Sequence, residues 1–256
     1  MNKFFERSTQ AAGIATHAKR FGLVVLVAAF THSPMASAQQ QSAVYLGSAG
    51  TFAVLSGTTV TNTGATAING DLGVWPGTAI TGFGPGVITG AEDAGDVVAH
   101  HAQASLGIAY NGAAARTSTS IIALAGDISG QTLVPGLYKS TSTLSLTGTV
   151  TLNGTGVYIF QIASGLTVGT GGTVVLSGGA TADNVFWQVG SSATLGTTAK
   201  FKGTILALTS ISLATGARLD GRALALHGAV TLDTNDVNIP LGDTVLVTRP
   251  QPRHRN

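Results

Sequence analysis

Cysteine is absent from this sequence of 256 residues, and charged residues make up only 9% of it. A chain without cysteine has no disulfides, so its stability must come from backbone hydrogen bonds and a packed apolar core. Aromatic residues are also few, at 6%, whereas the chain contains 35 glycines and many threonines. This composition is too apolar for a disordered chain and too rich in Gly and Thr for a helical one. We therefore expect one β-rich domain with many tight turns.

The first 38 residues are typical of an export signal. Lys3, Arg7, Lys19 and Arg20 precede an apolar run of ten residues at 21–30, and Ala-Ser-Ala at 36–38 is an A-x-A cleavage site. The sequence predicts that residues 1–38 are removed and that the mature protein is secreted, with a periplasmic location as an alternative. An uncleaved membrane anchor also stays open, although ten apolar residues are few for a membrane span.

Removal of the signal peptide changes the charge of the protein. It takes away four of the 13 basic residues and one of the 11 acidic residues, which leaves 9 − 10 = −1. Arg249, Arg253 and Arg255 lie in a tail at 244–256, so the expected folded domain at 39–243 is more acidic still. The positive charge of the whole chain is thus no sign of nucleic-acid binding, and we expect no such partner.

A direct repeat is the most informative pattern in the chain. Residues 192–209 (SATLGTTAKFKGTILALT) are followed without a gap by residues 210–227 (SISLATGARLDGRALALH), and eight of the 18 positions are identical. A unit this short cannot bury its own apolar face, so each unit must be one coil of a stack. Its length divides into three strand-sized stretches of about six residues. The repeat predicts a three-sided β-helix.

The first side of each coil carries hydroxyl residues, and we call it the Ser/Thr side. Its strands are expected at 144–146, 166–168, 193–195, 211–213 and 230–232, with a weaker member at 60–62. Because strand side chains alternate between faces, the middle residue of each strand points outward while its neighbours point inward. The middle residues form a first column, and a second column is expected at the strand ends. The second column comprises Thr63, Thr147, Thr170, Thr197, Thr215 and Thr234.

The other two sides differ from the first. The charged side comprises the segments TAKFKG and GARLDG, in which Phe201 and Leu219 point inward and Lys and Arg point outward. The apolar side comprises TILALT, RALALH, VFWQV and VYIFQI. Its inward and its outward residues are both hydrophobic, so its outer surface must be covered. A helix at 97–116 is the expected cover. Its apolar residues recur at helical spacing, after acidic residues that suit a helix N-terminus. These apolar residues are Val98, Ala102, Leu106, Ala109, Tyr110 and Ala113.

A flat array of hydroxyl and methyl groups can order water. Coils stack about 4.8 Å apart and alternate residues of a strand lie about 6.7 Å apart, so the array has a regular spacing close to that of ice. Threonine is also a favoured residue of any solvated strand, and a surface-binding or carbohydrate-binding adhesive module is the second hypothesis. The residues expected to contact ice are Thr61, Thr63, Ser145, Thr147, Thr167, Thr170, Ser192, Thr194, Thr197, Ser210, Ser212, Thr215, Thr231 and Thr234.

Several segments resemble the secreted microbial ice-binding proteins with a discontinuous β-solenoid fold. They include LGSAGTFAVLSGTTVTNTGATAINGDLGV (46–74), PGTAITGF (76–83), LVPGLY (133–138), NVFWQVG (184–190) and LDGRALALHGAVTLDTN (219–235), and the resemblance covers about 43–240. It implies an all-β, three-faced β-helix with one long helix packed alongside, a coil order that does not follow chain order, and a flat ice-binding face. It also implies no cofactor and no catalysis. We expect a monomer whose partner is the ice surface.

Catalytic and metal sites find little support in the sequence. The Asp residues are scattered in turn-like contexts, whereas glycoside-cleaving β-helices gather carboxylates on one face. Asp96, His100 and His101 could in principle meet on one helix face as metal ligands, but a solvated helix start is the preferred interpretation. Trp187 is expected in the core and Trp75 in a loop. The chain is therefore predicted to be no enzyme.

Overall fold

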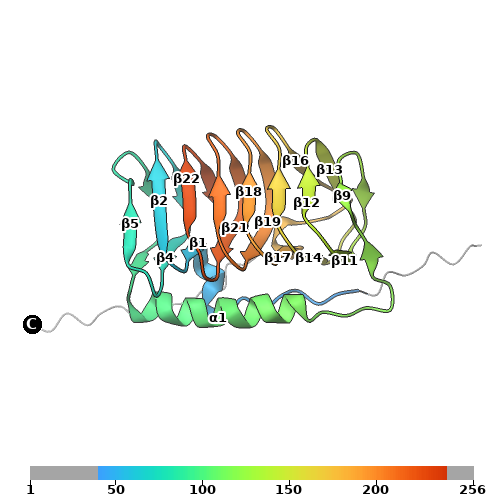
Figure 1. The fold of residues 1–256 in the computed structure, drawn as a ribbon, viewed down its shortest axis with the longest axis horizontal. Coiled ribbons are helices and arrows are strands. Elements are labelled where there is room, and N and C mark those ends of the chain that lie inside the picture. Colours follow the sequence, from blue (N-terminus) through green and yellow to red (C-terminus); the bar gives the residue numbers. More distant parts are fainter. Residues whose placement is uncertain (1–39, 241–256) are drawn as a thin grey trace, which may run out of the picture. The chain divides into compact units, whose positions relative to one another are not determined.

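The structure is a computed structural model, and it describes residues 40–240. The predicted signal peptide and the tail at 244–256 lie outside these residues. Within them, short parallel strands form coils that stack along one axis, and the helix α1 (Val97–Ala114) runs beside the stack (Figure 1). Two short 3-10 helices, η1 (Gly47–Thr51) and η2 (Ala182–Asn184), lie in the connections. The predicted three-sided β-helix with a helix alongside is confirmed.

Each side of the β-helix is a parallel ladder. The Ser/Thr side consists, in stacking order, of β5 (Ala79–Thr81), β2 (Thr59–Thr63), β22 (Val230–Asp233), β20 (Ile211–Leu213), β18 (Ala193–Leu195), β15 (Leu166–Val168), β12 (Leu144–Leu146) and β9 (Gly126–Asp127). The charged side consists of β6 (Val87–Ile88), β3 (Ala67–Asn69), β23 (Asp236–Asn238), the first parts of β21 (Arg218–Ala225) and β19 (Lys200–Ala207), β16 (Thr173–Ser177), β13 (Thr149–Asn153) and β10 (Thr132–Leu133). The apolar side consists of β7 (Glu92–Ala94), β4 (Asp71–Val74), β1 (Phe52–Ser56), the second parts of β21 and β19, β17 (Val185–Val189), β14 (Tyr158–Ile162), β11 (Gly136–Ser140) and β8 (Ile122–Ala123).

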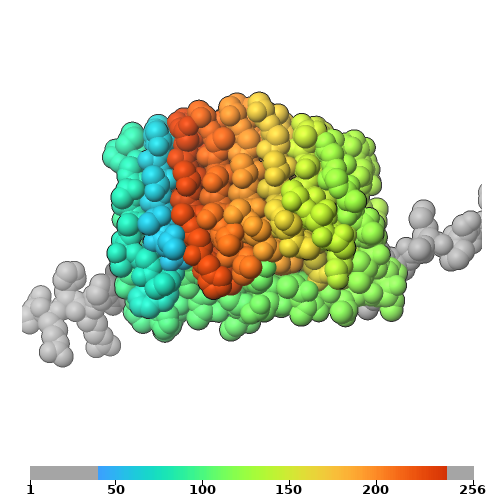
Figure 2. Space-filling model, in the orientation of Figure 1, coloured from blue at the N-terminus to red at the C-terminus, as the bar shows by residue number. Residues whose placement is uncertain are grey.

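The order of the coils departs from the order of the chain. Strand β22, from the C-terminal part, lies between β2 and β20, and β1, from the N-terminal part, pairs with β21. One coil is therefore a composite of β22, β23 and β1. In Figure 2 the C-terminal part of this coil, around β22, appears as a red band between the blue band of the N-terminal part and the orange band of residues near 210. The discontinuity implied by the resemblance is confirmed.

Strands β19 and β21 run without interruption around the corner between the charged and apolar sides. Glycine makes this possible, because Gly203 and Gly221 lie opposite each other at the corner. A Cβ atom on Gly221 would lie 1.9 Å from the carbonyl oxygen of Gly203, so no other residue fits there. Gly203 also has φ of 103°, a conformation that only glycine adopts readily.

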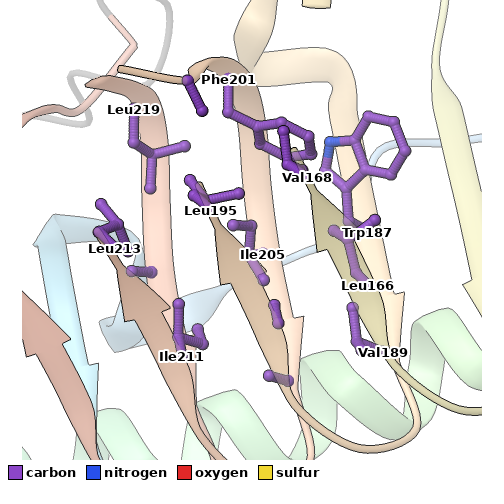
Figure 3. Packing of buried hydrophobic residues seen from close by; sticks show 14 of the residues in the cluster. Leu166, Val168, Trp187, Val189, Leu195, Phe201, Ile205, Ile211, Leu213 and Leu219 are labelled. Atoms are coloured by element: carbon purple, nitrogen blue, oxygen red, sulfur yellow. The ribbon is translucent and has the colours of Figure 1, made fainter. Parts of the chain in front are cut away.

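Inward-pointing residues from all three sides fill the interior. Tyr138, Phe160 and Trp187 stack ring on ring, with centroids 4.9 and 3.8 Å apart, and Phe201 continues the row. The indole nitrogen of Trp187 donates to the carbonyl oxygen of Lys202 at 3.0 Å. Figure 3 shows Trp187 beside the aliphatic residues of neighbouring strands. Trp187 is fully buried, which confirms its predicted place in the core.

Helix α1 covers the apolar side, as predicted. Ala102, Leu106, Ala109, Tyr110 and Ala113 are buried against outward residues of β1, β14, β17, β19 and β21. Val98 was predicted to face the sheet, but it is 37% exposed, and Ala99 is buried in its place. The reason is helix geometry: Ala99 lies about two turns before Leu106 on the same face, whereas Val98 lies about 80° around the helix from Leu106. The Asp96 side chain caps the helix by accepting a hydrogen bond from the backbone nitrogen of Ala99 at 2.9 Å.

Polar side chains fix the cover in position. The amide nitrogen of Gln161 donates to the carbonyl oxygens of Ala113, Ala114 and Arg116 at 2.9–3.0 Å, and so satisfies the C-terminal end of α1. Arg222 is fully buried, and its Nε donates to the carbonyl oxygen of Gly50 at the end of η1, at 2.9 Å. The helix and the N-terminal segment are thus bound to the sheet by specific hydrogen bonds as well as apolar contact.

Candidate functional site

The first column of the Ser/Thr side is continuous. Thr194 of β18 lies opposite Thr167 of β15 on one side and Ser212 of β20 on the other. Ser145 follows Thr167, and Thr231 follows Ser212. Thr61 of β2 then lies opposite Thr231, so that strands distant in sequence contribute to the same row. The flanking residues of each strand are buried in the core, and the hydroxyl residues face outward.

The first column is longer than the sequence analysis anticipated. Thr81 of β5 extends it beyond Thr61, and Asp127 of β9 ends it beyond Ser145. The segment Ala79-Ile80-Thr81 alternates as the other strands do, and this pattern could have identified Thr81. Asp127 carried no such signal, because its carboxylate departs from the Ser/Thr pattern.

The second column is held in register by backbone hydrogen bonds between consecutive coils. The nitrogen of Gly171 donates to the carbonyl oxygen of Thr197, and that of Thr198 donates to Thr215, which places Thr170, Thr197 and Thr215 in one row. The nitrogen of Gly216 donates to Asp233, and that of Thr234 donates to Thr63. Asp233 therefore lies between Thr215 and Thr63.

Thr234 is not a member of the second column, contrary to the prediction. It has φ of 51°, in the left-handed region, and it belongs to the turn that leads to the charged side. Its hydroxyl donates to the Oδ1 of Asp233 at 3.1 Å. One residue, Leu232, separates the first and second columns in the coil of β22, whereas two residues separate them in the coil of β20. The spacing of the β20 coil therefore pointed to Thr234 instead of Asp233, and strand pairing across the composite coil is needed to detect the difference.

Thr147 also departs from the predicted row. The nitrogen of Gly169 donates to the carbonyl oxygen of Leu146, so Thr147 lies beside Gly169 rather than Thr170. The coils are close here: a Cβ atom on Gly196 would lie 2.6 Å from the carbonyl carbon of Gly169. The two glycines between the first and second columns let consecutive turns approach, which keeps this part of the side level.

Ser192 and Ser210 lie at the opposite edge of the Ser/Thr side, where the strands begin. The hydroxyl of Ser192 is 2.7 Å from that of Thr209, and the hydroxyl of Ser210 accepts from the nitrogen of Ala229 at 3.2 Å. Both side chains are half-buried. Their hydroxyls form hydrogen bonds within the turns, and the two residues lie at the edge of the hydroxyl array.

The two carboxylates on this side are bound to neighbouring hydroxyls. Asp127 accepts from the hydroxyl of Ser129 at 2.6 Å and from the hydroxyl of Thr147. The hydrogen bonds from Ser129 and then Thr147 lower the pKa of the Asp127 carboxyl below its ordinary value, so it is ionised at neutral pH. Asp233 accepts from the hydroxyl of Thr215 at 2.5 Å. The remaining members of the two columns described above are Ser and Thr, with no charge.

The sequence profile of the Ice-binding-like family matches residues 54–238. The chain belongs to this family. An ice-binding protein from Nostoc sp. (strain HG1) is 43% identical over 241 residues, which span 92% of this chain and 86% of that protein. The Ice-binding-like family is one of binding proteins, and the prediction that the chain is no enzyme is confirmed.

Solved structures agree with this assignment to the Ice-binding-like family. The crystal structure of an ice-binding protein from an Antarctic biological consortium is 50% identical with a TM-score of 0.78, over 80% of this chain and 94% of that one. A glycosylated ice-binding protein from Arctic yeast is 34% identical with a TM-score of 0.71, over 85% of this chain and all of that one.

The charged side and the start of α1 do not carry a regular array of hydroxyl residues like that of the Ser/Thr side. On the charged side, a cavity of about 520 Å³ is lined by Val175, Leu176, Phe201 and the ion pair of Lys202 with Asp220. Trp75, His100 and His101 form ring contacts at the start of α1, with Trp75 and His100 centroids 4.7 Å apart. Between residues 40 and 240, no three His, Asp or Glu side chains gather as a metal site.

Proposed function

We propose that this protein adsorbs to ice through the Ser/Thr side and inhibits the growth and recrystallisation of ice. The single observation that carries the proposal is the register of the first column, in which Ser212, Thr194, Thr167 and Ser145 lie opposite one another on consecutive parallel strands. The relatives described as ice-binding proteins support the same function.

The geometry suits a crystalline surface. Parallel strands repeat at about 4.8 Å across the side. The second column runs beside the first, with Thr170 after Thr167 and Thr197 after Thr194. Each threonine adds a hydroxyl that can exchange hydrogen bonds with water and a methyl around which water forms a cage. A rigid backbone ladder holds these groups in place before ice is met, so little conformational entropy is lost on adsorption.

We further propose that the protein acts outside the cell as a monomer. The N-terminal 38 residues have the features of a signal peptide, and a relative from Arctic yeast is glycosylated, a modification of secreted chains. Among residues 40–240, no helix is both long and apolar enough to cross a membrane.

Ice-affinity partitioning of residues 39–256 tests the function. The protein should enter a slowly growing hemisphere of ice and should shape single ice crystals. If a sample with a β-rich circular dichroism spectrum is left entirely in the liquid, ice binding is wrong, and the adhesive module becomes the better hypothesis.

Substitution of Thr194 tests the choice of side. Thr194→Tyr places a bulky group at the centre of the first column, above the buried Ala193 and Leu195, and should remove most thermal hysteresis because the side can no longer approach a flat surface. Stability should change by no more than about 0.5 kcal/mol. Lys200→Tyr, on the charged side of the same coil, is the matched control and should keep full activity. Loss of activity in Lys200→Tyr alone would move the site to the side that contains Thr149, Thr151 and Thr173.

A further inference from the structure

Asp233 is a charged residue within an otherwise neutral part of the Ser/Thr side. It belongs to the second column, where Thr215 precedes it and Thr63 follows it. Asp127, by contrast, lies on β9, the last strand of this ladder. The coils of β20, β18, β15 and β12 lie between these two carboxylates, whereas β2 and β5 lie beyond Asp233.

A carboxylate is a poor template for ice. Its oxygens only accept hydrogen bonds, so the surrounding water molecules all point their hydrogens toward it, whereas each water in ice donates two bonds and accepts two. Removal of that hydration shell is costly for an ionised group. Water next to Asp233 therefore keeps an orientation that an ice layer cannot share.

Asp233 also constrains the hydroxyls beside it. Thr215 donates to its Oδ2 at 2.5 Å, and Thr234 donates to its Oδ1 at 3.1 Å. A hydroxyl has a single hydrogen to donate, so Thr215 cannot donate to a water of the ice layer while this bond holds. The effect of the charge thus extends to the neighbouring coil.

We infer that Asp233 divides the Ser/Thr side and confines ice contact to the coils of β20, β18, β15 and β12. Thr61, Thr63, Thr81 and Thr231 have the geometry of the array but lie outside the contact. This inference rests on the proposed function and names the part of the side that carries it. Asp233 is a residue that determines the extent of the contact, and its removal should enlarge the contact.

The direct test replaces Asp233 and measures thermal hysteresis at equal protein concentration. Asp233→Thr should raise thermal hysteresis above that of the parent, because the second column becomes continuous from Thr170 to Thr63. Asp233→Asn keeps the shape of the side chain without the charge and should also give a rise, though a smaller one. Asp236→Asn, on the charged side, is the matched control and should leave activity unchanged.

A second pair of variants locates the boundary. Thr61→Tyr should cost much less activity than Thr194→Tyr in the parent, but in the Asp233→Thr background it should abolish the gain. If Thr194→Tyr has no effect, the proposed side is wrong and this inference fails with it. Two outcomes would overturn only the inference and leave the proposed function standing, provided that Thr194→Tyr abolishes activity. In the first, neither substitution of Asp233 raises activity. In the second, Thr61→Tyr is as damaging as Thr194→Tyr. Should Asp233→Thr fail to fold, Asp233→Asn alone decides.

Discussion

The Ser/Thr side and the apolar side are made by the same coils and the same kind of parallel ladder, yet their outward residues have opposite surroundings. Thr167, Thr194 and Thr231 face outward and are exposed, whereas Ile159, Phe186 and Leu206 are buried beneath α1. The backbone does not distinguish the two sides, because β-ladders accept either kind of residue. Side-chain size and polarity decide which side needs a cover and which can present a level surface.

The cover of the apolar side should be sensitive to charge. Leu106 is fully buried between α1 and the sheet, so Leu106→Asp should lower the free energy of unfolding by roughly 3–5 kcal/mol, because an unpaired carboxylate would be buried. Thermal or denaturant unfolding monitored by circular dichroism measures this loss. Ala104→Asp, on the exposed face of the same helix, is the control and should unfold like the parent. Equal melting of Leu106→Asp and the parent would contradict the docking of α1.

Reciprocal substitutions sharpen the comparison between the two sides. Ile159→Thr, under the helix, should cost about 2–3 kcal/mol, because it replaces a packed ethyl group with a buried hydroxyl. Thr167→Ile, on the Ser/Thr side, should change stability by less than about 0.5 kcal/mol. Both values come from equilibrium unfolding in denaturant. Similar losses for the two variants would show that the Ser/Thr side is covered as well.

The buried tyrosines of the interior that both sides share should make stability depend on pH in the alkaline range. Burial raises the pKa of Tyr138 and of Tyr158 to about 12, from an ordinary value of 10.0. Because the folded protein retains these protons where the unfolded chain loses them, the contribution of the two tyrosines to stability should be constant below pH 10 and should fall as the pH rises toward 12. Melting temperatures across this range measure the effect. The double variant Tyr138→Phe/Tyr158→Phe should show a shallower decline, and an identical decline would assign the effect to other groups.

Local pattern was sufficient to predict most of the fold and the first column. Residues 192–227 repeat with one period, and alternation within each coil identified Thr167, Thr194 and Ser212 as outward and Leu195 and Leu213 as inward. Helical spacing identified α1 and its buried apolar residues from Ala102 to Ala113, although it did not identify the buried Gln103. These predictions depend on neighbours along the chain or one coil away, where side-chain direction follows from strand or helix geometry.

Features that depend on distant pairing were not accessible in the same way. The sequence by itself determined the three sides, their chemical character and the need for a cover over one of them. The tertiary structure alone decided that β22 lies beside β2, that Asp233 rather than Thr234 joins the second column, and that Arg222 is buried against η1. The physical reason is that strand alternation sets which way a residue points, whereas its partner in the next coil is set by which strands pair, and pairing between the two ends of the chain leaves no period in the sequence.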